Sequence, residues 1–475
     1  MEWKRMDAYQ TLVARLQEKY RARDGAVSAL LDEGVPGKLL ARARKMRRRL
    51  ADNLCMPGAA VDAATDAKVT ARLQQDGYAI ENVIITDDTG YAIPVNLYLP
   101  DAEPGPHPAV VVSMGHWPRG KQLPENQIFC ANLARCGIIA ATYDPICQGE
   151  RSPFSQQEFE RCFGAVPEDI QAVDLHMQAG NLSYLLGENL GALFVRDSMR
   201  VVDYLCSRPD VDTKRIGATG QSGGGTQTTY LAALDDRICC YSPIQCLTKQ
   251  AMTLVENGIG DCEQSIVGIS AGEGFDYADV LWAAFPKPCM LSAASEDFFL
   301  LEGVRQLEGE MRRLYKAAGN AAFFSVQVAP CAHVISAPTR MFGYDFFCRQ
   351  LLNKEGPASE VDTAVLKDEQ LACLPHISLA GLFERPTGCP ACRISALGSQ
   401  PYRRGSPRWR SFRPGGHRAR RCAPSLQNFM MFHRLRIRYS HCGARMRGRR
   451  FCCGTAGGRR RAAACAGAAT RSVWP

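Results

Sequence analysis

The sequence contains no stretch that could hold the protein in a membrane and none that could cradle a nucleotide phosphate. No apolar run in its 475 residues approaches the roughly 18 residues needed to cross a bilayer. The opening residues, MEWKRMDAYQ, lack the apolar core and the cleavage site of a secretory signal. The glycine-rich turn at 220–225 is not followed by Lys-Ser or Lys-Thr, so it is not a P-loop. We therefore expect a cytoplasmic protein without membrane contact.

Lysine and acidic residues are almost absent from the end of the chain. Residues 376–475 contain 21 Arg, no Lys, no Asp and a single acid, Glu384. Residues 1–375 then hold 36 basic against 47 acidic residues, a net charge of −11, which gives this body no reason to bind nucleic acid. We predict that 376–475 is a disordered basic tail, the product of a frameshift in a GC-rich gene. The alternative is an arginine-rich tail that binds RNA.

Metal-ligand spacing is also missing, although the chain has 21 cysteines. The cysteines of the body are irregularly spaced, many lie in apolar runs, and they read as small core residues. In the tail, Cys389-x-x-Cys392 has no second pair at zinc-ribbon spacing. We expect no metal and no organic cofactor, and free cysteines fit a reducing compartment.

The periodicity of apolar residues divides the body into three parts. Residues 1–75 have helical spacing and predict an N-terminal helical extension. Its basic stretch 38–54 reads as a solvated helix face that packs on the acidic body, with an anionic partner as the alternative. In 76–356, short apolar runs alternate with helical patterns, which predicts an α/β domain with a mostly parallel sheet flanked by helices. The polar segment 357–375 reads as a linker, and no internal repeat is visible.

The stretch RIGATGQSGGGTQTTY, residues 215–230, carries the strongest chemical signal. An apolar strand pattern leads into Gly220-Gln221-Ser222-Gly223-Gly224, and a helical pattern follows. A serine on such a strand-to-helix turn has a strained backbone and an exposed hydroxyl, and the flanking glycines allow close packing. The N–H of Gly223 would face a developing oxyanion. A glycine-rich turn with a solvated serine is the alternative reading.

A nucleophilic serine requires a base and an acid, which in this layout follow it along the chain. His333 is the only histidine of the body after Ser222, and it follows a predicted strand. The acid should follow the strand before that one, where Glu296 and Asp297 are the candidates. The competing interpretation is that His333 is a loop residue whose hydrogen bonds are structural and not catalytic.

The second oxyanion donor should come from the loop after the first central strand, Gly115-His116-Trp117. The backbone N–H of His116 is the expected donor. The indole of Trp117 would line the pocket as a platform for a sugar ring or an apolar acyl group. An ordinary packing role is equally open for this tryptophan.

Several blocks of the chain resemble the acetyl xylan esterase-like branch of the α/β-hydrolases over roughly residues 75–355. The matching blocks are SMGHWPRGK (113–121), YDPICQGER (143–151), LGENL (186–190), DSMRVVDYLCSRPDVDTKRIGATGQSGGGTQT (197–228), SEDFFLLEG (295–303) and AHVIS (332–336). The resemblance implies an α/β-hydrolase fold, a serine esterase acting on carbohydrate esters, chiefly O-acetyl groups, and Asp297 as the acid. The chain departs from the pattern at Cys147, Cys331-Ala332 and Val334.

The implied partner is a small-molecule or oligosaccharide ester, and the sequence leaves the oligomeric state open. Gln148, Glu150 and Arg151 are candidate substrate contacts, with a structural salt-bridge cluster as the alternative reading. A prolyl-oligopeptidase-like peptidase shares the order of the triad, but the chain has no N-terminal region long enough for a propeller. A catalytically inactive binding protein of the same fold is the non-enzymatic alternative.

Overall fold

The computed structural model describes six segments of the chain, all within the compact unit Met1–Pro401. They are residues 8–56, 66–86, 92–101, 105–153, 168–249 and 275–374. The predicted basic tail, 376–475, lies outside these residues. None of the described helices combines the length and the apolar character of a membrane span.

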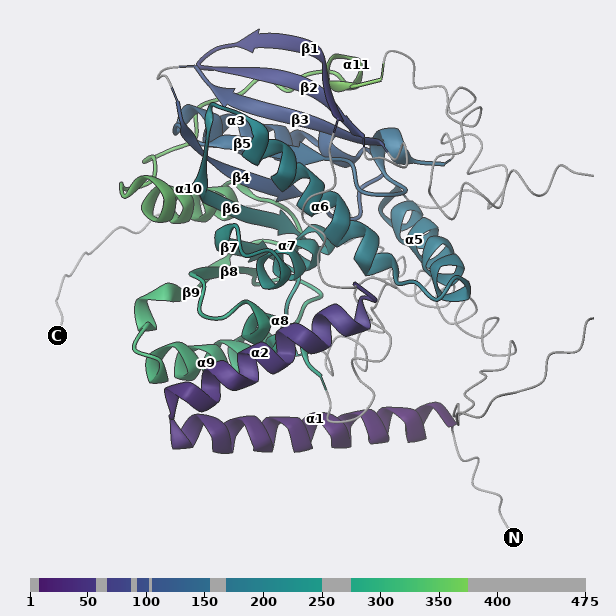
Figure 1. Cartoon of the computed structure of the whole chain (residues 1–475), viewed down its shortest axis with the longest axis vertical. Coiled ribbons are helices and arrows are strands. Elements are labelled where there is room, and N and C mark those ends of the chain that lie inside the picture. Colours follow the sequence, from purple (N-terminus) through teal and green to yellow (C-terminus); the bar gives the residue numbers. More distant parts are fainter. Residues whose placement is uncertain are drawn as a thin grey trace, which may run out of the picture. The chain divides into compact units, whose positions relative to one another are not determined.

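A nine-stranded sheet forms the centre of the unit, in the order β1-β2-β3-β5-β4-β6-β7-β8-β9 (Figure 1). The first three strands and the β3–β5 pair are antiparallel, and all pairs from β5 to β9 are parallel. This confirms the mostly parallel sheet predicted from the apolar runs. The strands are β1 (Asp66–Gln75), β2 (Tyr78–Thr86), β3 (Ala92–Pro100), β4 (His107–Ser113), β5 (Ile139–Tyr143), β6 (Val211–Gln221), β7 (Ile238–Ile244), β8 (Cys289–Ala294) and β9 (Phe324–Ala329).

Helices cover both faces of the sheet, as the near-continuous apolar strands require. Along β4, Val111 packs into one core while Val110 and Val112 pack into the other. The first core is completed by α6 (Leu190–Ser207), α7 (Gly223–Leu234), α8 (Tyr277–Ala284) and α9 (Leu301–Ala317). The second core is completed by α3 (Pro124–Arg135) and α10 (Ala337–Leu352). A smaller cluster joins α6 to α5 (Glu168–Leu185).

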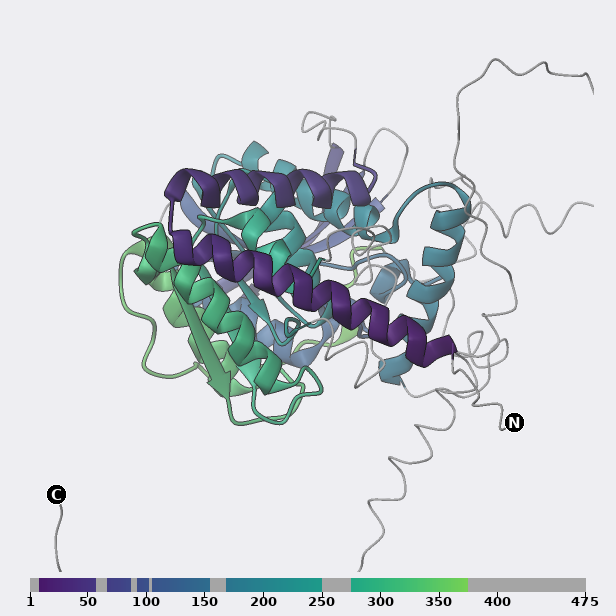
Figure 2. The ribbon, with the colours of Figure 1, turned by 90° about the horizontal axis from the view of Figure 1, so that it is seen from below.

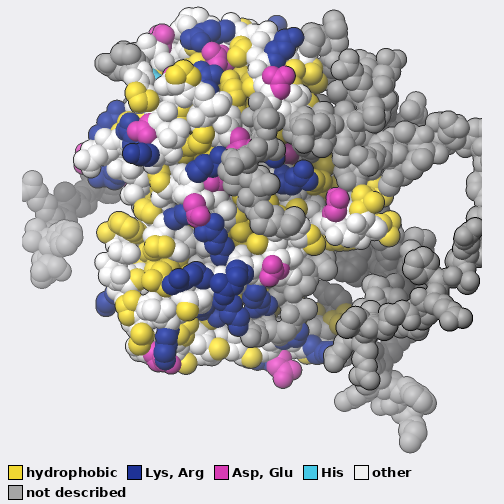
Figure 3. All heavy atoms as spheres, in the orientation of Figure 1, with side chains coloured by type: hydrophobic (Ala, Val, Ile, Leu, Met, Phe, Trp, Pro, Cys, Tyr) yellow, Lys and Arg dark blue, Asp and Glu magenta, His cyan; other side chains and the backbone are white. Residues whose placement is uncertain are grey.

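The N-terminal helices α1 (Ala8–Glu33) and α2 (Pro36–Asn53) pack on the outside of the first helical layer (Figure 2). Leu39, Met46 and Leu50 of α2 are fully buried there. Lys and Arg side chains gather over its outer face (Figure 3), while Arg42 pairs with Asp279. The basic stretch therefore packs on acidic groups of the body, as the first interpretation of its sequence expected.

One element of the N-terminal extension differs from the sequence prediction. Residues 66–75 form β1, which pairs antiparallel with β2 in the register Asp66 opposite Thr86, rather than a further helical turn. The stretch DAKVTARLQQ is polar because β1 is the edge strand of the sheet and remains mostly solvent-exposed. A strand with so few buried side chains carries little of the alternating apolar pattern from which strands are recognised.

The segment read as a linker lies against the sheet and α3 as far as Leu374, and it includes α11 (Asp368–Leu371). Its backbone is held by amide side chains: Gln127 accepts from Leu366 N at 2.9 Å, and Asn96 donates to Leu371 O at 2.8 Å. Leu371 and Cys373 are buried. We call residues 357–374 the C-terminal strap. The polar composition of 357–374 did not predict that it packs on the domain. The strap is held mainly through its backbone, and the sequence does not show backbone hydrogen bonds.

Candidate active site

Ser222 stands at the sharp turn between β6 and α7. Its backbone has φ +58° and ψ −125°, which confirms the strained conformation predicted for this serine. A Cβ on Gly220 would lie 2.5 Å from Ser113 O, and one on Gly224 would meet the same oxygen. Both glycines are therefore required for the close approach of β4 to the turn. The helix α7 begins at Gly223, so its first N–H groups have no acceptor within the helix.

His333 and Asp297 are in direct contact, in the loops that follow β9 and β8. The Nδ1 atom of His333 lies 3.0 Å from Oδ1 and 3.1 Å from Oδ2 of Asp297. The carboxylate is almost wholly buried, with 1% of its side chain exposed, and it also accepts a hydrogen bond from Phe299 N. Glu296, the competing acid, is exposed to solvent instead. The structure thus joins His333 to the acid that the resemblance implied.

The parallel order β6-β7-β8-β9 brings the loops of Ser222, Asp297 and His333 to the same edge of the sheet. Of the three residues, His333 and Asp297 are in contact, while the hydroxyl of Ser222 makes no hydrogen bond to the imidazole of His333 among the described contacts. Such serine–base contacts are often long in the absence of substrate and shorten when it binds.

Two glutamines link the serine turn to the histidine loop, and the sequence analysis did not identify this bridge. Gln221 donates through Nε2 to Oε1 of Gln245 at 2.8 Å, and Gln245 donates in turn to Val334 O at 2.9 Å. Gln221 directly precedes Ser222, and Val334 directly follows His333. A buried glutamine at the carboxyl end of β7 could have drawn attention, but nothing in the sequence shows which side chains it meets.

The loop 115–117 lies against the serine turn. A Cβ on Gly115 would be 3.3 Å from Ser222 Cβ, and one on Gly223 would be 2.6 Å from the imidazole of His116. The predicted oxyanion residues His116 and Gly223 are therefore neighbours. Trp117 is half-buried and helps to line a cavity of about 10 Å³ beneath the turn, a space that holds about one water molecule.

The predicted substrate contacts at 148–151 are turned into the protein. Gln148 is fully buried and donates to Gly115 O at 2.5 Å and to Trp117 O at 2.8 Å. Arg151 donates to Asp197 at 2.5 Å. Gln148 thus holds the loop of His116 and Arg151 pairs within the protein, so the structural reading of the cluster fits their positions better than substrate contact does.

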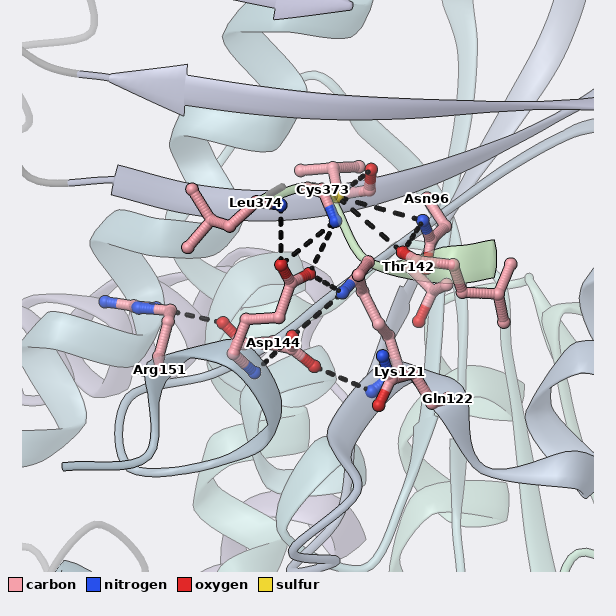
Figure 4. Close-up of polar contacts among 12 residues, drawn as sticks. Asn96, Lys121, Gln122, Thr142, Asp144, Arg151, Cys373 and Leu374 are labelled. Carbon is pink, nitrogen blue, oxygen red and sulfur yellow. Dashed lines mark hydrogen bonds and ion pairs between the residues drawn. The ribbon is translucent and has the colours of Figure 1, made fainter. Parts of the chain in front are cut away.

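Glu150 forms a buried ionic network with Lys121 and Asp144, the two residues of it that Figure 4 labels. Lys121, which is fully buried, donates to Asp144 Oδ2 at 3.0 Å and to Glu150 Oε1 at 2.5 Å. Glu150 also accepts from the backbone N–H groups of Cys373 and Leu374 at 2.9 and 2.8 Å. Burial alone would lower the pKa of the Lys121 ammonium, but the two carboxylates and Cys373 raise it above its usual range. The network ties the C-terminal strap to the site.

Cys147, one of the departures from the family pattern, has a left-handed backbone with φ +66°. Glycine adopts this conformation without strain, so the cysteine stands at a backbone position that favours glycine. Among the described residues, no group of three or more His, Cys, Asp or Glu side chains has an arrangement that could hold a metal ion.

Comparisons with known proteins bear on the family and the fold. Residues 78–258 match the family model for acetyl xylan esterase (AXE1), which confirms the resemblance. A Bacillus subtilis (strain 168) protein named "Putative hydrolase YtaP" is 28% identical over 158 residues, 33% of this chain and 52% of its own length. The matched stretch therefore spans about half of that curated relative. The solved structure of "Methylesterase BT1017" is 20% identical with a TM-score of 0.56, covering 76% of this chain and 74% of its own, and shows a shared fold.

Proposed function

We propose that this α/β-hydrolase, a member of the acetyl xylan esterase-like branch, hydrolyses carboxylic esters of carbohydrates, O-acetyl esters in particular. The observation that carries the proposal is the contact of His333 Nδ1 with Asp297 at 3.0 Å, at the same sheet edge as the strained turn of Ser222. The family match and the hydrolase relative support ester hydrolysis. The identity of the acyl group as acetyl and of the alcohol as a sugar is the more specific part of the proposal.

The proposed reaction passes through an acyl-enzyme. Ser222 Oγ attacks the ester carbonyl while His333 Nε2 takes its proton, and Asp297 holds the imidazole and stabilises its charged form. The backbone N–H groups of Gly223 and His116 stabilise the oxyanion. The intermediate collapses as His333 returns the proton to the leaving alcohol. Water then attacks the acyl-enzyme by the same route, which releases the acid and restores Ser222.

The test uses a fluorophosphonate probe and a panel of esters: p-nitrophenyl acetate, acetylated xylo-oligosaccharides, glucuronoyl esters and feruloyl esters. We expect the probe to label Ser222 and acetylated sugars to be cleaved. Ser222→Ala and His333→Ala should each lower kcat by roughly 10⁶-fold. Ser207→Ala is the matched control, because this serine lies at the end of α6, where its hydroxyl caps Tyr204 O. Retention of most activity by Ser222→Ala would refute the mechanism. Absence of labelling in the wild type would also refute it, and would favour an inactive binding protein.

A further inference from the structure

An exposed aromatic ring stands beside the imidazole of His333. Phe298, the residue after Asp297, has its ring centroid 4.3 Å from that of His333, at an interplanar angle of 36°. Phe298 is 41% exposed, whereas its neighbour Phe299 is 3% exposed and lies 4.9 Å behind it. The buried ring of Phe299 therefore supports Phe298 from below, and part of the Phe298 ring faces solvent.

A second exposed apolar residue is next to the histidine in the chain. Val334, which follows His333, is 44% exposed. Single exposed apolar residues are common on protein surfaces, but apolar surface close to a reacting group indicates a place for a ligand. Here the Phe298 ring packs against the imidazole that contacts Asp297.

The chemistry of the proposed reaction determines which part of the substrate would lie there. His333 returns its proton to the leaving oxygen, so the alcohol half of the ester must be next to its Nε2 atom when the bond breaks. The Phe298 ring, whose centroid is 4.3 Å from that of the imidazole, is close enough for an alcohol in that position to reach it. The acyl carbonyl is turned instead towards Gly223 and the loop of His116.

We propose that Phe298 is the platform of an alcohol subsite, which stacks against the ring of the alcohol: the C–H face of a pyranose or an aryl group. This inference rests on the proposed function and deepens it. A flat aromatic face gains little from a short alkyl alcohol, whereas a ring covers it and removes its apolar surface from water. Phe298 would therefore select for ring alcohols whatever the acyl group.

The test holds the acetyl group constant and changes only the alcohol. Wild type, Phe298→Leu and Phe298→Trp are assayed on phenyl acetate, a mono-acetylated methyl xyloside and ethyl acetate. We expect Phe298→Leu to raise KM for both ring esters by about five- to tenfold and to leave ethyl acetate unchanged. Phe298→Trp, which keeps a ring, should preserve the preference. Phe323→Leu is the matched control, because Phe323 is 43% exposed on the short turn η4 (Ala321–Phe323).

The other results would overturn the inference. An equal fall in kcat on all three esters would make Phe298 a support for the imidazole of His333 rather than a substrate platform. If Phe298→Leu has the wild-type kcat and KM on all three esters, Phe298 has no role in binding the alcohol. A folded wild type that cleaves none of the three esters and does not react with the fluorophosphonate would refute the proposed function itself, a result distinct from either of these.

Discussion

The glutamine bridge between the serine turn and the histidine loop can be broken with one isosteric change, Gln245→Met. Methionine has nearly the volume and the flexibility of glutamine but cannot replace its amide. The change removes the acceptor of Gln221 Nε2 at 2.8 Å and the donor to Val334 O at 2.9 Å. The loop that carries His333 would then lose a direct connection to the turn that carries Ser222.

The size of the effect follows from the burial of the groups left behind. Gln221 is 2% exposed, so its amide cannot exchange the lost acceptor for water. A buried polar group without a partner costs about 1–3 kcal/mol. If a similar energy is lost in aligning the imidazole with the hydroxyl, kcat should fall by about 10- to 100-fold, since each 1.4 kcal/mol is a factor of ten. KM should change little, because no substrate contact is removed.

The assay compares kcat, KM and urea unfolding of Gln245→Met with those of Gln127→Met. Gln127 is the matched control, because it is also 2% exposed and holds the strap through Gln127 Oε1 and Leu366 N at 2.9 Å. Both variants should lose stability, but only Gln245→Met should lose kcat. If the two variants lose stability alike and both keep wild-type kcat, the bridge holds the fold and has no part in aligning the site.

Three further predictions concern the supports of the fold. Lys121→Met leaves two carboxylates buried without their cation, and urea unfolding should show a loss of about 3–5 kcal/mol. A chain that ends after residue 356 should unfold at a lower temperature than one that ends after 375, because the first lacks the strap; equal melting temperatures would refute its role. Burial raises the pKa of Asp276 to about 6. Relative to Asp276→Asn, the wild type should therefore lose about 2 kcal/mol as pH rises from 4 to 7, measured by urea unfolding at each pH.

The sign of the Asp276 prediction follows from where the proton binds more tightly. The pKa of the folded carboxyl lies above its ordinary value of 3.8, mainly because it is buried. The folded state therefore binds the proton more strongly, and this contribution is fully present below pH 3.8. It is lost as pH rises through about 6. Parallel stability curves for the wild type and Asp276→Asn would contradict the shifted pKa.

The parts of the fold that could be predicted from sequence are those that bury apolar residues in a regular pattern. The core strands β4 to β9 and their covering helices follow from apolar runs such as Ala109–Met114, because burial on both faces leaves little choice of residue. The edge strand β1 and the strap were missed for the opposite reason. Their contacts are mostly backbone hydrogen bonds, to which any residue except proline contributes equally.

The contact of His333 with Asp297 could be predicted for two other reasons, chain order and the family resemblance. The α/β-hydrolase layout places the acid and the base after the nucleophile, and only one histidine of the body satisfies that rule. Chain order left Glu296 and Asp297 open as the acid, and the resemblance selected Asp297, but neither shows what holds these residues. Gln245 sits 23 residues beyond Ser222 and 88 before His333 in the printed sequence, and no local pattern connects the three.

The block YDPICQGER, 143–151, shows how a polar cluster near an active site can be misread. Its residues have the composition of a binding loop, and yet Gln148 and Glu150 are buried. Oxyanion stabilisation requires N–H groups that are held in place before the reaction, because dipoles that must reorient during it contribute much less. Gln148 fixes the carbonyls on both sides of His116, and Glu150 is itself fixed by Lys121 and the strap. If the N–H of His116 is the oxyanion donor that we propose, Gln148 and Glu150 bear on the chemistry by holding the backbone at His116 rigid, and not by contacting the substrate.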